Sequence, residues 1–126
     1  MARRKSSFLT DGELRLMQVL WSKGPATVGE VVESIEGPQP PAYNTVLTML
    51  RILERKGYVT HAKDGRAFVY RPQIGREDAR RSAVSQLLRR MFDDSPALLV
   101  LNLLEHQKAK PDELRRLRAL IETSGD

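Results

Sequence analysis

The sequence of 126 residues predicts a mainly α-helical chain with one small β-hairpin, and three observations support this fold class. Apolar residues recur at helical spacing over residues 10–56. The period then changes to the alternation of β-strands over residues 58–71, and helical spacing returns from residue 76 onward. A chain of this length buries roughly two-thirds of its unfolded surface, which is enough for one domain or for two small lobes.

Two sequence signatures mark the beginnings of the first two helices. Thr10-Asp11-Gly12-Glu13 and Thr27-Val28-Gly29-Glu30 both have the form of a capping box, in which a threonine and a glutamate satisfy the first N–H groups of a helix. Gly24-Pro25 ends the first helix. We expect the two helices to turn inward the apolar residues Leu14, Met17, Leu20, Trp21, Val28, Val31, Val32 and Ile35.

A third helix is expected over residues 42–56, after a rigid, proline-rich turn at residues 37–41. Gly57 stands where a left-handed helix cap is wanted, directly behind the basic last turn. The inward stripe of this helix is predicted to be Val46, Met49 or Leu50, and Leu53.

A β-hairpin is expected next, because residues 58–63 and 67–71 are rich in β-branched and aromatic types and Asp64-Gly65 between them is typical of a turn. Trp21, Phe68 and Tyr70 are predicted to lie in the core of this lobe. Three compact helices followed by a basic hairpin describe a winged helix-turn-helix, which we assign to residues 8–72. A flexible basic arm, residues 1–7, precedes it.

Pro72 and Gly75 mark a boundary, after which a helical dimerisation domain is expected over residues 76–124. One helix covers residues 76–92, Ser95-Pro96 begins the next, and Pro111 begins the last. Residues 97–104 are apolar almost all round, and this short region is too small to enclose them alone.

A second copy of the chain would cover these leucines, so we expect a homodimer. The alternative is that the region folds back on its own winged lobe. The predicted interface residues are Leu87, Leu88, Met91, Leu98, Leu101, Leu104, Leu117 and Ile121.

The charge of the chain indicates an acidic partner. The net charge is +5, and residues 1–71 hold 11 basic and 7 acidic residues, whereas residues 72–126 hold 10 and 9. Nucleic acid is the commonest partner of such a basic protein. Binding of double-stranded DNA is therefore predicted for the winged lobe.

The composition excludes most catalytic and metal chemistry. The absence of cysteine excludes disulfides, thiolate metal sites and cysteine nucleophiles, and two histidines with no nearby ligand pattern do not indicate zinc. No triad order, P-loop or glycine-rich phosphate motif is present. We predict no enzyme, no cofactor and no metal. Without a signal sequence or an apolar run long enough to span a membrane, a cytoplasmic protein with no membrane insertion is expected.

The outer face of the third helix and the hairpin tip carry the candidate DNA contacts. Asparagine can pair with adenine and arginine with guanine, while the methyl groups of threonine and leucine can meet that of thymine. Basic residues at the hairpin tip suit the sugar-phosphate backbone. The candidates are Tyr43, Asn44, Thr45, Leu47, Thr48, Arg51, Arg55, Lys63 and Arg66.

Two alternatives stay open at this point. A merely solvated helix would present the same face. For individual residues, Tyr43 and Leu47 could instead pack inward, and Arg55 could serve only the helix C-terminus. A winged-helix module that docks an acidic protein and binds no DNA would carry the same charge.

Several stretches share their order, spacing and apolar identities with a known family. They are Leu9-Thr10-x-x-Glu13-x-x-Leu16-Met17-x-x-Leu20-Trp21, Ala42-Tyr43-Asn44-Thr45-Val46-Leu47-Thr48-Met49-Leu50, Lys56-Gly57-Tyr58-Val59, Phe68-x-Tyr70 and Leu99-Val100-Leu101-Asn102. Over residues 8–122 the chain thus resembles the penicillinase and methicillin-resistance repressors, the BlaI/MecI family.

This resemblance implies a dimeric winged-helix repressor of transcription that binds palindromic operators. Such repressors block genes for β-lactamases, altered penicillin-binding proteins or other stress functions, which implies a link to antibiotic resistance. The positions that match the family's DNA contacts are Asn44, Thr45, Leu47, Thr48 and Arg51, with Leu47 where better-known relatives carry a basic residue.

The resemblance also implies a route of inactivation. In members that respond to β-lactams, a membrane sensor-protease triggers cleavage of the C-terminal lobe between an asparagine and a phenylalanine, and the dimer falls apart. The matching residues here are Asn102 and Leu103, so only the first side of the bond is kept. The chain lacks the C-terminal cysteine cluster of the related copper-responsive repressors.

Overall fold

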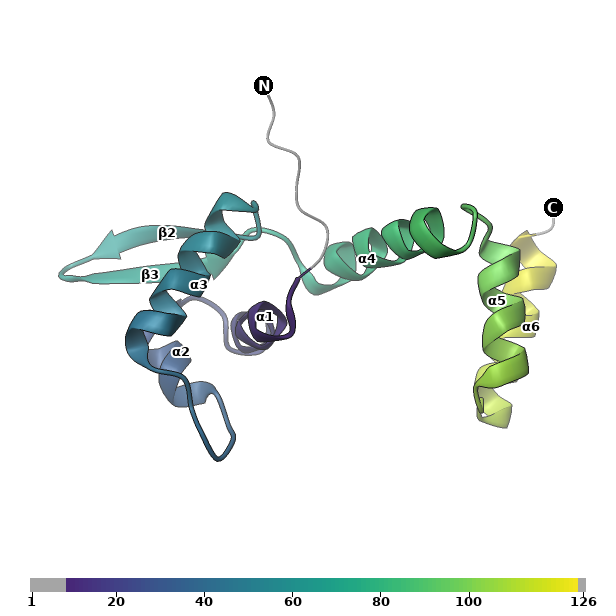
Figure 1. The fold of residues 1–126 in the computed structure, drawn as a ribbon, viewed down its shortest axis with the longest axis horizontal. Coiled ribbons are helices and arrows are strands. Elements are labelled where there is room, and N and C mark those ends of the chain that lie inside the picture. The colour runs from purple at the N-terminus through teal and green to yellow at the C-terminus, as the bar shows by residue number, and fades with distance from the viewer. Residues whose placement is uncertain (1–8, 125–126) are drawn as a thin grey trace, which may run out of the picture. The chain divides into compact units, whose positions relative to one another are not determined.

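The computed structural model describes residues 9–124, and the arm expected over residues 1–7 lies outside them. By its internal contacts the chain divides into two compact units between Val84 and Ser85. The fold is mainly helical with one small antiparallel sheet, as predicted (Figure 1). In chain order its elements are α1 (Asp11–Lys23), β1 (Ala26–Thr27), α2 (Val28–Ser34), α3 (Tyr43–Arg55), β2 (Val59–Asp64), β3 (Ala67–Pro72), α4 (Arg76–Met91), α5 (Pro96–His106) and α6 (Pro111–Ser124).

The sheet of the N-terminal unit has the strand order β1-β3-β2, with both pairs antiparallel. β2 and β3 form the predicted hairpin. β1 was not predicted, because its two residues are too few to show an alternating pattern. Ala26 of β1 pairs with Tyr70 of β3, which ties the segment between α1 and α2 to the base of the hairpin.

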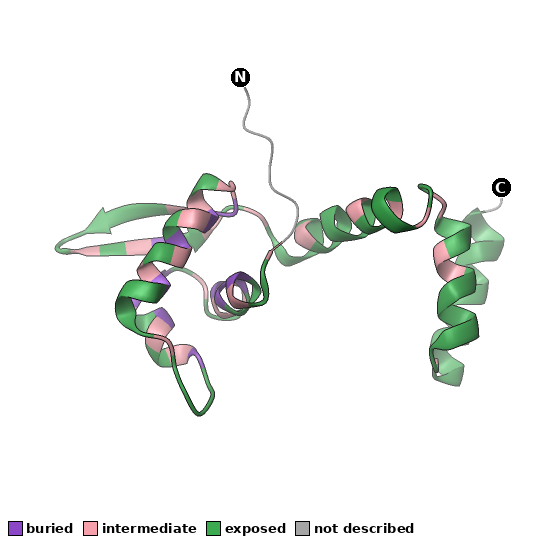
Figure 2. Cartoon of the chain, viewed as in Figure 1, coloured by how far each residue is buried: buried purple, intermediate pink, exposed green. Residues whose placement is uncertain are grey.

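One buried cluster holds the three helices of this unit against the sheet. Figure 2 shows the buried positions on the inner sides of α1 and α3. Full burial of such side chains is worth about 1.5–3 kcal/mol each, so the cluster supplies much of the unit's stability. Its buried members are Leu16, Met17, Leu20, Ala26, Val28, Val31, Ile35, Val46, Leu50, Leu53, Tyr58, Val59 and Tyr70.

The predicted left-handed cap joins α3 to the hairpin. Gly57 has a φ of +90°, a conformation that favours glycine. Its N–H donates to the carbonyl of Glu54 at 3.0 Å, and the N–H of Tyr58 donates to that of Leu53 at 2.9 Å. This is the bond pattern of a Schellman motif, and it brings Tyr58 into the core directly after the helix ends.

The hairpin turn lies one residue later than predicted. Asp64 pairs with Ala67, so the turn consists of Gly65 and Arg66 rather than Asp64 and Gly65. Gly65 has a φ of +65°, and a positive φ at the first turn residue is the requirement of a type II′ turn. Glycine therefore takes the first place in the turn instead of the second.

Three predicted core positions differ in burial. Phe68 is 42% exposed, so its assignment to the core was wrong. It pairs with Lys63 near the end of the hairpin, and the hairpin extends past the helices (Figure 1). Leu14 is 37% exposed, and Leu16 is buried in its place. Trp21 is half-buried against the core, and its indole Nε1 donates to the carbonyl of Ile74 at 2.9 Å.

The two compact units divide within α4, between Val84 and Ser85, which is later in the chain than the boundary expected at Pro72 and Gly75. The first turn of α4 is attached to α1, because the Arg76 guanidinium lies over the Trp21 ring at 5.6 Å and donates to the Ser22 hydroxyl at 3.3 Å. The beginning of α4 therefore belongs to the N-terminal unit.

The C-terminal unit has regular helices but no core of its own. α5 begins as predicted, with the Ser95 hydroxyl accepting from the N–H of Leu98 and with Pro96 in the first turn. No residue from Ser85 to Ser124 is buried, although α5 is apolar almost all round (Figure 2). None of the helices that the structure describes is long and apolar enough to cross a membrane.

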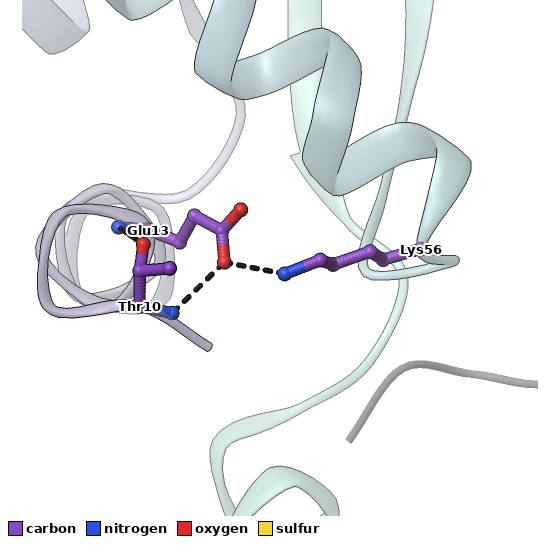
Figure 3. A network of polar contacts seen from close by, with 3 residues as sticks. All are labelled: Thr10, Glu13 and Lys56. Atoms are coloured by element: carbon purple, nitrogen blue, oxygen red, sulfur yellow. Dashed lines mark hydrogen bonds and ion pairs between the residues drawn. The ribbon is translucent and has the colours of Figure 1, made fainter. Parts of the chain in front are cut away.

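A buried carboxylate links the start of α1 to the end of α3 (Figure 3). Glu13 is 4% exposed. Its Oε1 accepts from the Thr10 N–H at 2.9 Å, which completes the capping box, and from the Lys56 ammonium at 2.7 Å. Burial raises the pKa of the Glu13 carboxyl, but the hydrogen bonds from Lys56 and Thr10 outweigh it and hold that pKa below 4.5.

Glu13→Gln should lower the free energy of unfolding of the N-terminal unit by about 1–3 kcal/mol at neutral pH, because the buried carboxylate loses the negative charge that pairs with Lys56, while the amide oxygen can still complete the cap. Urea unfolding followed by the fluorescence of Trp21, the single tryptophan, measures it. The stabilisation is present above pH 4.5 and is lost as the pH falls through the lowered pKa, where wild type and variant should converge.

Glu30→Gln is the matched control, since Glu30 holds the same place in the second capping box but is exposed. It should cost less than Glu13→Gln. Equal losses would show that the contact with Lys56 adds nothing to the cap.

Candidate nucleic-acid interface

The two faces of α3 differ in character. Val46, Leu50 and Leu53 are completely buried in the core, which directs the opposite face to solvent. That face is polar and basic. Its exposed residues are Tyr43, Asn44, Thr45, Thr48, Arg51 and Arg55, all of them candidates from the sequence.

Leu47 and Tyr43 lie at the edge of this face. Leu47 is half-buried and packs against the core, in line with the inward packing left open above. Tyr43 is 53% exposed, so it does not pack inward. The side chain of Tyr43 therefore belongs to the outer surface, whereas only part of the Leu47 side chain is accessible there.

The N-terminus of α3 has no side-chain cap, unlike those of α1, α2 and α5. Ala42 holds the N-cap position, and its methyl group cannot accept a hydrogen bond. The first N–H groups of an α-helix have no partner within the helix. Together with the positive end of the helix dipole, they form a site suited to a phosphate.

Arg51, on the outer face of α3, lies close to Tyr70 of the hairpin. Burial raises the pKa of the Tyr70 phenol and the Glu54 carboxylate raises it further, while the positive charge of the nearby Arg51 guanidinium opposes this rise. Arg51 therefore lies on the side of α3 that faces β3. A guanidinium has five donors, so several stay available for a base or a phosphate.

The hairpin tip adds two exposed cations, Lys63 at the end of β2 and Arg66 in the turn. Among the residues that the structure describes, neither forms a salt bridge with a carboxylate. A phosphate would therefore not have to displace an internal partner.

Sequence reasoning missed one polar contact beside this surface, in which His61 of β2 meets Glu54 of α3. The Nδ1 of His61 lies 2.8 Å from Oε1 and 2.9 Å from Oε2 of Glu54. The sequence does contain one indication of where His61 lies: side chains alternate along a strand, so His61 is on the same face of β2 as Lys63. No local pattern shows that this face turns toward α3, because Tyr70 of β3 determines that by its burial.

The predicted interface residues all lie in α4, α5 and α6, and none is buried. Asn102 and Leu103 are both exposed in the middle of α5. Their backbone is helical, so a protease that needs an extended segment would have to act on a locally unwound α5. Among the described residues, no three histidine, aspartate or glutamate side chains gather as metal ligands would.

The chain matches known repressors over nearly its full length. A profile of the penicillinase repressor family matches residues 9–123. The penicillinase repressor of Bacillus licheniformis is 30% identical over 119 residues, which cover 94% of this chain and 93% of the relative. The transcriptional regulator BlaI of Mycobacterium tuberculosis is 33% identical over 121 residues, 94% of this chain and 88% of that protein.

A solved structure matches the N-terminal part of the fold. The solution structure of the DNA binding domain of the repressor BlaI aligns with a TM-score of 0.53 at 34% identity, covering 60% of this chain and 93% of that chain. The winged helix predicted from the sequence is thereby confirmed. From the match of residues 9–123, the chain belongs to the penicillinase repressor family, which is a family of transcriptional repressors and not of enzymes.

Proposed function

We propose that the protein is a DNA-binding transcriptional repressor that acts as a homodimer on a palindromic operator. The single observation that carries this proposal is the outer face of α3: polar, exposed, uncapped at its start and flanked by the cations of the hairpin tip. Membership of a repressor family supports it independently. Because its target is DNA, we expect the protein to act in the cytoplasm.

Each part of this surface has a distinct role in the proposed complex. α3 lies in the major groove, where Asn44, Thr48 and Arg51 reach base edges. The uncapped start of α3 meets a phosphate, and Lys63 and Arg66 meet the backbone beside the groove. Phosphate contacts determine position, whereas the α3 side chains determine which sequence is bound.

The exposed apolar surface of α5 and α6 supports the homodimer. Large patches of exposed apolar surface mark interaction sites in soluble proteins. Leu101, Leu104, Leu117 and Ile121 are all exposed in the single chain. A two-fold axis through such a surface would present two α3 helices to two half-sites, which doubles the number of DNA contacts.

Loss of the dimer would then end repression. We propose that a membrane sensor-protease triggers cleavage of α5 between Asn102 and Leu103. The cut would remove α6 and the end of α5 from the apolar surface, and each N-terminal unit would be left with only half of the DNA contacts. The regulated genes would include those for β-lactam resistance.

Thr48→Ala and Arg51→Ala should each weaken binding to the operator by about 1–3 kcal/mol and hardly affect binding to mixed-sequence DNA. The reason is that contacts with base edges form only on the correct sequence. Fluorescence anisotropy measures both affinities, with a duplex that the wild-type protein selects from a random library as the operator. Equal losses on the two DNAs would contradict base recognition by these residues.

Ala42→Asp should raise the stability of the N-terminal unit by about 0.5–1 kcal/mol while it weakens DNA binding. The new carboxylate would cap the first N–H groups of α3 and occupy the place of the phosphate. Urea unfolding and anisotropy measure the two opposite effects. Ala42→Ser is the control, since it caps without charge and should weaken binding less. Unchanged binding in Ala42→Asp would remove this helix start from the interface.

Leu101→Asp should yield a monomer, because dimerisation would bury the new carboxylate among apolar side chains without a partner. Light scattering measures the mass, and operator affinity should fall with it. Leu101→Met keeps volume and apolar character and should stay dimeric. A dimeric Leu101→Asp protein would place the interface elsewhere.

A further inference from the structure

Phe68 is an exposed aromatic residue for which the core provides no role. The residue is 42% exposed and lies near the hairpin tip. It pairs directly with Lys63 across the hairpin, so the two side chains stand on the same face. An aromatic ring and an ammonium therefore lie side by side on the tip of the wing.

This face of the hairpin is the one that turns toward α3. His61 and Tyr70 form the next pair on the same face. Tyr70 is buried in the core close to Arg51 of α3, and His61 contacts Glu54 of the same helix. Phe68 and Lys63 thus continue, toward the tip, the surface that begins at the outer face of α3.

The Phe68 ring is held by His61, which is itself held by contacts with Glu54 and Tyr70. The rings of His61 and Phe68 meet edge to face, with centroids 5.2 Å apart and an angle of 86° between planes. His61 is in turn held by both carboxylate oxygens of Glu54, and its ring also lies 5.3 Å from that of Tyr70. Phe68 is therefore positioned from α3 through His61, although it lies on the exposed wing.

We propose that Phe68 is a DNA-contact residue, packing its ring on a deoxyribose while Lys63 binds the adjacent phosphate. This rests on the proposed function and adds to it an apolar contact that charge alone does not indicate. Along a DNA strand each anionic phosphate is followed by a largely apolar sugar, which is the alternation that Lys63 and Phe68 present. The nearest acidic residue of the tip, Asp64, pairs with Ala67 and so lies on the opposite face.

The same geometry makes His61 a positioning residue. It does not have to touch DNA, but it orients the Phe68 ring from behind. Its effect on DNA binding should therefore depend on the presence of that ring.

The test compares Phe68→Ala with Lys63→Ala over a series of salt concentrations in the full-length protein. Phe68→Ala should weaken binding about tenfold at every salt concentration, because an apolar contact releases no counterions. Lys63→Ala should lower the slope of log affinity against log salt by about one. The loss in Phe68→Ala should be equal on selected and mixed-sequence DNA, since a sugar contact does not distinguish bases.

Arg71→Ala is the matched control for charge. Arg71 is exposed on the same hairpin, but it pairs with Thr60 and so lies on the face opposite Phe68. Its removal should leave affinity nearly unchanged. Phe68→Leu keeps part of the apolar contact and should lose less than Phe68→Ala, and an unchanged Trp21 emission shows in each variant that the N-terminal unit is folded.

Unchanged affinity in Phe68→Ala would overturn the proposal while the proposed function stands, and so would a loss confined to the selected sequence. Absence of DNA binding in the wild type would instead overturn the proposed function. For His61, the test is a double-mutant cycle. His61→Ala should weaken binding about threefold alone and should add nothing in a Phe68→Ala background; additive losses would overturn its positioning role.

Discussion

Burial of the inner stripe of α3 is the constraint on which the rest of the N-terminal unit depends. Val46, Leu50 and Leu53 are completely buried, so the helix can present only one face to a partner. A slip of one residue in this packing would rotate α3 by about 100° and turn much of the outer face toward the core. The contact of Glu13 with Lys56 and the Gly57 cap hold the end of α3 in this rotation.

Local signals explain how much of the fold could be predicted. Both capping boxes, the Gly57 cap and the Ser95-Pro96 helix start depend on residues within a few positions of one another, and the structure contains all of them. The outer face of α3 could be predicted too, because helical spacing alone separates it from the inner stripe.

The features that could not be predicted are contacts between segments that are far apart in the sequence but close in space. Phe68 and Tyr70 stand on the same face of β3, but only the latter lies close enough to the helices to be buried. The contact of His61 with Glu54 requires the hairpin to lie along α3, which no spacing within either segment contains. β1 exists only because β3 is there to pair with it.

Because no residue from Ser85 to Ser124 is buried, the state of the C-terminal unit should depend on how much of the protein a cell contains. In the homodimer that we propose, the C-terminal unit obtains its core from association, so its folding follows mass action and depends on the concentration of protomers. Halving the copy number would then loosen the helices themselves as well as their pairing. Occupancy of a two-half-site operator would fall more steeply than in proportion to concentration, so abundance would itself be a regulatory input.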